Sequence, residues 1–484
     1  MPLMLSTAFA LSAQTAQKAI DEYLKALGGS KALAQIRTET IAGSLTEEST
    51  GRKGSWALIT KAPNRFYSEI IVGTDRVVEA YNGMSAWGQN SSGDPLTLTG
   101  EAAKQAEASG RYWNNRLADL KKGRLSVQPF GLEKVRGQNA WHIRVIAGPG
   151  TTRDVFFDGE THLIARETTP SGQFDYEGYR PVGGIQTPSR IELEVAGHTY
   201  KISITRAEIN SPVDDAVFDF PGVPGTALPD VKALMLEVTK NQKQIEEIQK
   251  QYTCHLITEE EEIGSKGSAT SRKTSEFEVF NIAGEEVRRL IAKDGKPLTG
   301  DARKKEDNRF NKEFEKRTKD AARLAADPKK QAKQQADDEA QISDFLRAAR
   351  FSNARRERLR GQDVIAVDFG PNPDFKPKNA TESMVQKLAG VLWIDEKARD
   401  VARLEAHVDN SLKIGGGMVA SIEKGSSVVF EQARINDEVW LPSYVEIHVT
   451  GRALLLVKLK ANAIARYTDY KKFHTESKIV GIDQ

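Results

Sequence analysis

The two halves of this 484-residue chain carry the same short motifs in the same order, and this internal repeat constrains the fold more than any other feature. An Arg-Gly-Gln triplet followed by an apolar run occurs at 136–138 and again at 360–362. Later in each half a Pro-Ser pair precedes an alternating segment, at 188–189 and at 442–443. Because a single hydrophobic core stops growing near about 250–300 residues, we interpret the chain as two copies of one domain.

Each half begins with a helix and continues as an antiparallel meander. In the first half, apolar residues recur at helical spacing from Ala16 to Leu27, and Gly28-Gly29 supplies a stop. After about residue 38 the period changes to two, and Asn-Gly, Asp-Gly and Gly-Gly pairs separate several of the segments. The polar segment 100–122 returns to helical spacing. The pattern predicts an α+β protein of two tandem units.

A segment rich in proline and glycine divides the halves. Three Pro and two Gly lie between Phe220 and Pro229, a composition typical of a linker. We therefore predict a first domain at 14–221, a linker at 222–229 and a second domain at 230–484. The second domain contains a highly charged block, at about 301–350, that we interpret as a helical insert.

The first residues indicate export. Residues 1–13 form a short apolar stretch that ends in small residues, which is typical of a signal peptide cut near Ser12 or Ala13. The positively charged start of such a peptide is missing, so an ordinary apolar tail stays an alternative. No apolar run reaches the ~18–20 residues of a membrane helix. A lone cysteine, Cys254, excludes an internal disulfide.

Composition and motifs exclude several functions. The 69 basic and 67 acidic residues give a net charge of +2, which suggests neither a general nucleic-acid binder nor a protein of strongly anionic membranes, although a local patch could be hidden in that balance. The seven His residues lack the paired spacing of a metal site, and no nucleophile elbow or Walker loop occurs. We predict no metal, no cofactor and no catalysis. A hydrolase stays an alternative, because some active sites leave no linear signature.

Several weak motifs, taken in order, resemble those of a known family. In the first half they lie at 23–29, 62–66, 81–87, 136–138, 157–166 and 210–221. In the second half they lie at 360–362, 394–399, 439–443 and 467–473. Each half thereby resembles the outer-membrane lipoprotein carriers LolA and LolB, whose fold is shared by the lipid carrier LppX and the sensor RseB. The resemblance implies a curved antiparallel half-barrel covered by helices, in a periplasmic protein.

The fold that this resemblance implies encloses a cavity for acyl chains. We predict that ten residues on apolar strand positions line it: Trp56, Leu58, Phe66, Trp87, Trp141, Ile143, Val145, Phe156, Ile191 and Leu193. Dry core packing is the simpler expectation for any one of them. We expect the first domain to be the better apolar binder, because it holds three of these tryptophans.

The predicted function is a non-catalytic periplasmic carrier or binding protein for lipids or lipid-modified proteins. The alternative is an envelope sensor or scaffold that binds a protein partner. The expected partners are therefore acyl chains and envelope proteins, with no nucleic acid and no membrane-spanning segment.

Overall fold

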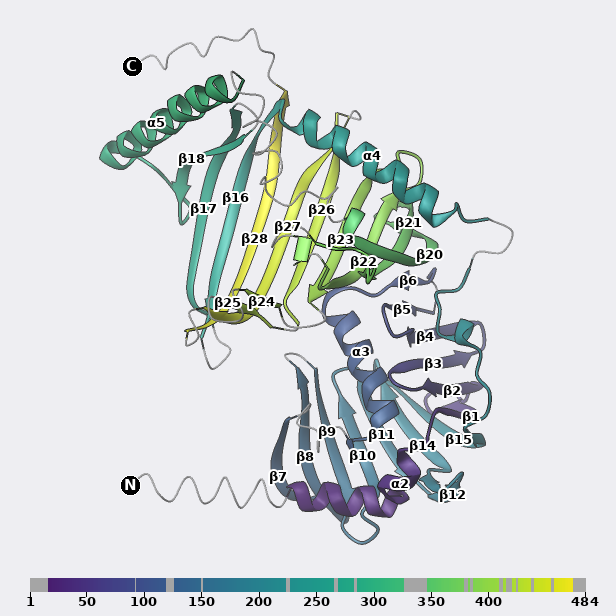
Figure 1. Cartoon of the computed structure of the whole chain (residues 1–484). Helices are drawn as coiled ribbons and strands as arrows, with labels where there is room; N and C mark the ends of the chain where they lie inside the picture. The colour runs from purple at the N-terminus through teal and green to yellow at the C-terminus, as the bar shows by residue number, and fades with distance from the viewer. Residues whose placement is uncertain are drawn as a thin grey trace, which may run out of the picture. The chain divides into compact units, whose positions relative to one another are not determined.

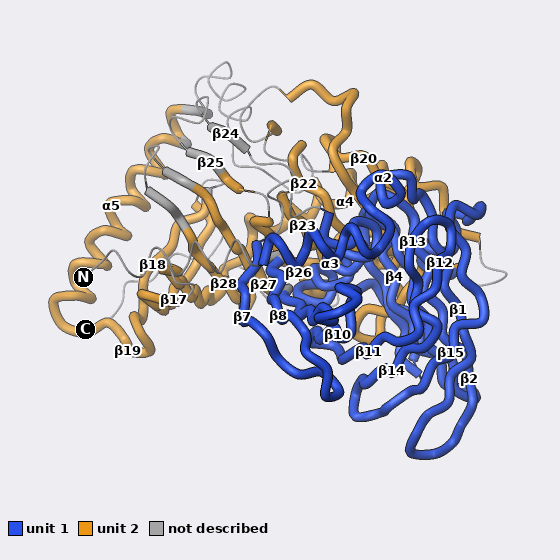
Figure 2. The backbone as a smooth tube through the Cα atoms, turned by 90° about the horizontal axis from the view of Figure 1, so that it is seen from below, with its two compact units in different colours: residues 1–221 blue, residues 222–484 orange. Residues whose placement is uncertain are grey.

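The chain, described here by a computed structural model, divides into two compact units, residues 1–221 and 222–484 (Figures 1 and 2). Segment 1–13, predicted to be a signal peptide, lies outside the described residues. The structure describes residues 16–91, 93–118, 126–148, 151–222, 227–264, 269–282, 285–325, 346–377, 382–383, 386–408, 412–414, 420–423, 425–436, 439–453 and 457–472.

Unit 1 is built on one open antiparallel sheet. Its strands follow the order β6-β5-β4-β3-β2-β1-β15-β14-β11-β10-β9-β8-β7, so β6 and β7 are the edges. The strand bounds are β1 Thr38–Glu47, β2 Lys53–Lys61, β3 Arg65–Val72, β4 Asp75–Tyr81, β5 Ala86–Gln89, β6 Leu96–Thr97, β7 Ser126–Val135, β8 Gln138–Gly148, β9 Thr151–Asp158, β10 Ile164–Thr169, β11 Gly172–Glu177, β14 Arg190–Val195 and β15 His198–Ile209. A separate ribbon joins β12 Arg180–Val182 to β13 Ile185–Thr187.

Helices cover one face of this sheet. The N-terminal helix, residues 16–27, packs Ile20, Leu24 and Leu27 against β8, β9 and β10. The short α2, Gly29–Leu33, follows it, and α3, Gly100–Asn115, packs on the strands around β2 and β3. The N-terminal helix and α3 both lie where the spacing of apolar residues predicts a helix. Apolar residues at every third or fourth position gather on one side of a helix, which then packs on the sheet.

The end of unit 1 covers part of the opposite face. After β15 the chain forms a 3-10 turn, Asp215–Val217, and buries Phe218 completely. Phe218 packs against Tyr67, Val78 and Trp87. The sheet of unit 1 is therefore covered by helices on one face and by its own C-terminal segment on the other.

Unit 2 repeats the plan with longer strands. Its main sheet follows the order β19-β18-β17-β16-β28-β27-β26-β23-β22-β21-β20, and β25 joins β24 to β27. The bounds are β16 Tyr252–Ile263, β17 Ala269–Ile282, β18 Glu285–Lys293, β19 Lys296–Pro297, β20 Ala349–Leu359, β21 Gln362–Pro371, β22 Leu388–Asp395, β23 Val401–Val408, β24 Leu412–Ile414, β25 Ala420–Ile422, β26 Ser427–Ile435, β27 Val439–Ala453 and β28 Val457–Lys472.

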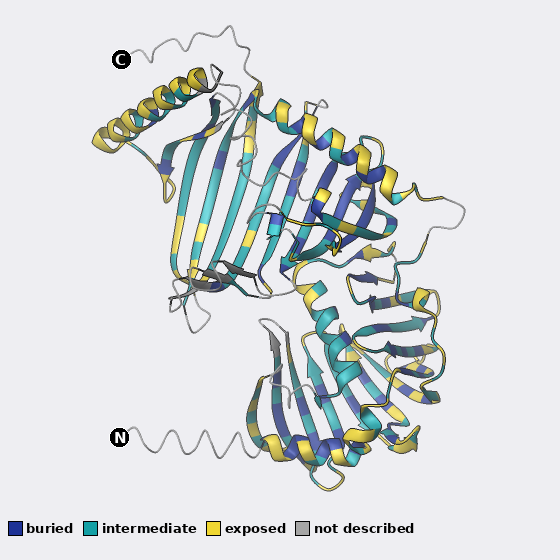
Figure 3. Cartoon of the chain, viewed as in Figure 1, coloured by how far each residue is buried: buried dark blue, intermediate teal, exposed yellow. Residues whose placement is uncertain are grey.

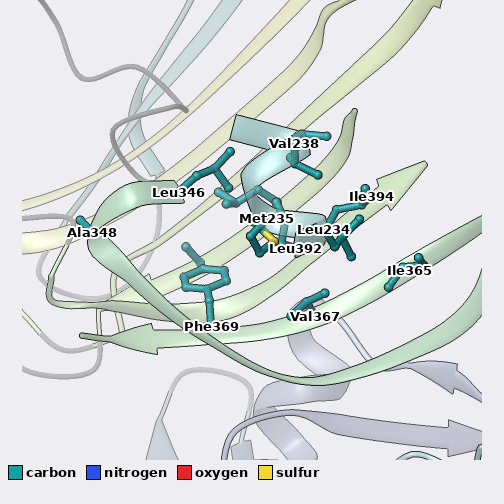
Figure 4. Packing of buried hydrophobic residues seen from close by; sticks show 13 residues of the cluster. Leu234, Met235, Val238, Leu346, Ala348, Ile365, Val367, Phe369, Leu392 and Ile394 are labelled. Carbon is teal, nitrogen blue, oxygen red and sulfur yellow. The ribbon is translucent and has the colours of Figure 1, made fainter. Parts of the chain in front are cut away.

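Two long helices belong to unit 2. In α4, Val231–Gln249, Asp230 caps the start by accepting a hydrogen bond from the Ala233 amide at 2.8 Å. Figure 4 shows Leu234, Met235 and Val238 of α4 packed on the apolar residues of β21 and β22. The charged α5, Gly300–Ala325, packs its Phe310 and Phe314 against β17 and β18. The rest of the predicted charged insert, 326–345, lies outside the described residues.

Backbone geometry at the repeated motifs supports the duplication. The Arg136-Gly137 pair joins β7 to β8 with φ of 49° and 82°, and Arg360-Gly361 joins β20 to β21 with φ of 51° and 83°. Positive φ at both central residues is what a two-residue hairpin turn requires. Asp158 and Asp395 each accept hydrogen bonds from two following backbone amides. The prediction of an α+β fold with two large, open, curved sheets is confirmed.

Candidate binding site

Eight of the ten predicted lining residues lie on the helix-covered face of unit 1 and pack there as core. Five belong to the cluster under α3 and are each at most 4% exposed: Trp56, Leu58, Phe66, Ile191 and Leu193. Three pack under the N-terminal helix: Trp141, Ile143 and Val145. Side chains of the two helices therefore occupy the space that an acyl chain would need.

The other two predicted lining residues, Trp87 and Phe156, lie on the opposite face. Trp87 packs under the C-terminal segment, and its indole N–H donates to the Phe218 carbonyl at 2.9 Å. Phe156 stacks on the ring of His142, with centroids 4.1 Å apart, whereas its neighbour Phe157 packs under the helices. Because side chains alternate along a strand, Trp87 and Phe156 lie on the face opposite to the helices, apart from the other eight predicted residues.

The space left beneath the helices of unit 1 is small. A cavity of about 30 Å³ lies among aromatic side chains from the N-terminal helix, α3 and β11, including Tyr23, Trp113 and Tyr176. That volume has room for one or two water molecules. This cavity, formed by described residues, is too small for a large ligand unless α3 moves.

A polar cluster lies at the centre of the helix-covered face. Glu167 on β10 is 1% exposed, and its carboxylate accepts hydrogen bonds from Tyr112 on α3, from Tyr176 at 2.9 Å and from Arg153 at 2.9 Å. The Arg153 guanidinium also lies 3.9 Å from the centre of the Tyr112 ring. Arg116, just after α3, forms a salt bridge with buried Glu39. These contacts tie α3 to the sheet.

Burial changes the acid–base properties of this cluster. It raises the pKa of Glu167 from its ordinary 4.5 to about 8, and it lowers the pKa of Arg153 to about 10. A carboxyl group with a raised pKa is a feature of some catalytic sites. Here three donors already occupy the carboxylate, and the adjoining cavity is too small for a substrate. The cluster therefore fits a role in positioning α3.

Among the residues that the structure describes, no group of His, Cys, Asp and Glu is arranged to hold a metal ion. Within the same residues, no helix is long and apolar enough to cross a membrane.

Unit 2 offers a different surface, an apolar stripe on β27 and β28. The stripe consists of three pairs of residues that lie directly opposite each other: Val445 and Ala465, Ile447 and Ala463, Val449 and Ala461. Ile447 is 39% exposed, and the other five are half-buried. Figure 3 shows the long strands β16, β27 and β28 mostly in the intermediate class. Three alanines in alternate positions of β28 lie opposite the larger residues of β27.

The apolar stripe continues the face that α4 covers. Val428 and Phe430 of β26 pack against the cluster beneath α4, and they lie opposite Ile447 and Val445. Helix α4 meets β27 only nearer its start, around Trp440, while α5 packs on β18. Within the described residues, no cluster of packed side chains joins either helix to the stripe. An apolar sheet face normally lies against a core, and among the described residues neither α4 nor α5 covers this one.

The other face of the same strands is polar, and its groups are paired. Glu446 accepts from the Tyr444 hydroxyl at 2.8 Å and contacts His448 Nε2 at 2.7 Å, while His448 Nδ1 lies 2.8 Å from the Asn462 side chain. Arg466 forms a salt bridge with Glu259. This face is suited to water, and the stripe is the face suited to an apolar ligand.

The sequence interpretation missed both the polar cluster and the stripe. Glu167 and Tyr112 are 55 residues apart, and no local motif joins them. The stripe did leave a signal, because Ala461-Asn-Ala-Ile-Ala465 alternates small residues with larger ones. Alternation of this kind predicts a strand with one smooth face.

No family model and no curated protein matches the chain. A solved DUF1329 family protein from Desulfovibrio piger is 12% identical; the match covers 42% of this chain and 96% of that one, with a TM-score of 0.30. A LolA superfamily protein from Nitrosomonas europaea is 12% identical; the match covers 40% of this chain and 96% of that one, with a TM-score of 0.28. A match to the complex of MucA and MucB from Pseudomonas aeruginosa is 9% identical and covers 94% of this chain and 99% of that one, with a TM-score of 0.15.

These structural neighbours include proteins of the fold that the sequence resembles. At such identities and TM-scores each likeness concerns the fold and carries no argument about function.

Proposed function

We propose that this chain is a non-catalytic periplasmic binding protein for the acyl chains of lipids or lipid-modified proteins. The observation that carries the proposal is the apolar stripe of unit 2, a half-exposed apolar continuation of a packed core. Each methylene that leaves water contributes ~0.8 kcal/mol. An acyl chain lying along the stripe would complete the burial that α4 begins, and no covalent step is needed.

The shape of the stripe favours a thin, flexible ligand. Ala461, Ala463 and Ala465 have small side chains, whereas Val445 and Ile447 on the neighbouring strand are larger. The three residue pairs run along roughly 13 Å of strand at about 3.3 Å per residue. The stripe offers no side-chain hydrogen-bonding group, so it would select for apolar character and not for a particular head group.

The test is a titration of the full-length protein with an environment-sensitive fatty-acid probe. We expect saturable binding that Ala463→Glu weakens by about tenfold or more, because the new carboxylate would have to be buried beside the probe. Ile447→Ala is the milder variant, and it should weaken binding while leaving the fold intact. Lys460→Glu is the matched control, because exposed Lys460 lies on the same strand and the opposite face.

Mass spectrometry of protein purified without detergent should show a co-purifying lipid. The proposal is wrong if the probe does not saturate, or if Ala463→Glu and Lys460→Glu bind it equally well.

A scaffold that binds a protein partner is the second candidate. It is favoured by Phe130 and Leu132, which are 45% and 54% exposed on the edge strand β7. Exposed apolar residues beside an unpaired strand edge suit an extended peptide. Against this, Pro129 and a bulge before Gly131 interrupt the edge, which is how sheets discourage pairing.

A further inference from the structure

We propose that the outward face of α5 docks the protein on anionic phospholipid bilayers. This proposal goes beyond acyl-chain binding and does not depend on the apolar stripe. The observation behind it is how charge is distributed around one long helix. The whole chain has a net charge of only +2, so a local concentration of one sign is meaningful.

Five cations form one row along α5: Lys305, Lys312, Lys316, Lys319 and Arg323. With 3.6 residues per turn, they lie within about 40° of a common line that runs for ~27 Å. All five are exposed. Phe310 and Phe314, which fix α5 to β17 and β18, lie about 140–180° away on the same geometry. The row therefore faces away from the sheet.

The acidic residues of α5 mostly lie elsewhere on the helix. Glu306 accepts a hydrogen bond from the Leu290 amide of β18 at 2.8 Å and pairs with Arg309 at 2.7 Å. Glu313 pairs with Arg317 at 2.8 Å. Asp301, in the first turn, shares the outward face, and Glu315 and Asp320 lie at its two borders. Glu306 and its partner Arg309 thus contact β18, while Glu313 is paired within the helix.

Three of the five cations have no acidic partner among the described residues. Lys319 and Arg323 lie at the limit of ion-pair distance, 3.9 Å from Glu315 and 3.8 Å from Asp320. For Lys305, Lys312 and Lys316 the described part of the chain shows no ion pair. Their ammonium groups can therefore approach an anionic partner without first breaking a salt bridge.

A bilayer of anionic phospholipid is the partner that fits this face. The row is straight, repeats at intervals of three to seven residues, and contains no apolar side chain that could insert into a membrane. Lysine ammonium groups bind phosphodiesters as point charges without demanding one geometry. Docking would be electrostatic and peripheral, with each cation contributing about fivefold to the affinity.

The experiment is flotation of the full-length protein with vesicles of phosphatidylcholine alone or mixed with phosphatidylglycerol. We expect binding to the mixed vesicles only, and loss of it at high salt, since screening shortens the range of such attraction. Replacing Lys305, Lys312 and Lys316 by Gln should reduce affinity about a hundredfold.

The matched control replaces Lys232, Lys240 and Lys243 of α4 by Gln, which removes the same charge from another exposed helix face of unit 2. It should bind like the wild type. An equal loss of vesicle affinity in the two triple variants would overturn the proposal, because removing positive charge anywhere on unit 2 would then weaken vesicle binding. Binding to phosphatidylcholine alone would also overturn it, as would capture of an acidic protein with no vesicle binding. Both triple variants should bind the fatty-acid probe as the wild type does. Vesicle docking and acyl-chain binding can therefore fail independently of each other.

Discussion

The hydroxyl of Tyr112 on α3 donates a hydrogen bond to the buried carboxylate of Glu167 on β10. Around this contact the interface between helix and sheet is apolar. Tyr112 is therefore matched to a buried carboxyl group beneath α3, and the Arg116–Glu39 salt bridge and the hydrogen bond from Asn114 to the Arg65 carbonyl add two further polar ties. A helix that slid or rotated would leave the Tyr112 hydroxyl without its acceptor and Glu167 without one of its three donors in a dry setting, which costs free energy.

The first prediction is that Tyr112→Phe destabilises unit 1 by about 1–3 kcal/mol, because Glu167 loses a donor while it stays buried. Urea denaturation followed by tryptophan fluorescence measures this, since four of the six Trp lie in unit 1. Tyr200→Phe is the control, because half-buried Tyr200 lies outside the cluster. Equal midpoints for Tyr112→Phe and wild type would contradict the role of the hydrogen bond.

The second prediction concerns pH. Burial raises the pKa of Glu167 from 4.5 to about 8 in the folded unit, so the folded state keeps a proton that the unfolded chain releases. The stabilising contribution of this group is complete below about pH 4 and is lost as the pH rises to about 8. The free energy of unfolding should fall across that window, and Glu167→Gln should remove the slope.

Urea melts at a series of pH values provide the measurement for Glu167. Glu48→Gln serves as control, because Glu48 is exposed; this variant should keep the wild-type slope. A wild-type stability that does not change between about pH 5 and pH 8 would rule out the protonated form.

The third prediction uses a close approach of backbones. A Cβ added to Gly110 of α3 would lie 2.1 Å from the Asn64 carbonyl oxygen. In an isolated helix Gly→Ala stabilises by about 1 kcal/mol, but here it must push α3 off the β2–β3 hairpin. Gly110→Ala should therefore lower the free energy of unfolding, while Ser109→Ala should leave it nearly unchanged. A stabilised Gly110→Ala protein would show that α3 is not held this closely.

Local patterns in the sequence predicted much of the fold. The helix at 16–27 and the helix within 100–122 depend on the spacing of neighbouring residues, and both are found in the structure. The two faces of a strand were harder to assign. In Phe156-Phe157 both residues are apolar, so the pattern could not tell which side chain points under the helices.

The candidate site could not be predicted from the sequence, because it is formed by contacts between residues far apart in the chain. Whether Trp56 and Leu58 line an open cavity or form core is decided by how closely α3 lies on them, and that distance depends on Gly110 and the Tyr112–Glu167 hydrogen bond. The stripe on β28 depends on the register with β27, which long-range pairing sets.

The fourth prediction concerns the lone cysteine. Burial raises the pKa of the Cys254 thiol to about 12, so almost no thiolate is present at neutral pH. We expect Cys254 to react with a maleimide far more slowly than a free thiol does, and to become reactive once urea unfolds unit 2. Cys254→Ser should leave fatty-acid-probe binding unchanged. Rapid labelling of the native protein would contradict this prediction.

The fifth prediction separates the two units. Each has its own packed clusters, so the fragments 14–221 and 230–484 should each unfold cooperatively. The second fragment should bind the fatty-acid probe, because no described helix covers the apolar stripe there, whereas the first must move α3 to open its inner face. In the first fragment, Tyr112→Phe should increase probe binding by loosening α3. Saturable binding by the wild-type first fragment alone would restore the inner face of unit 1 as the site and reject the stripe.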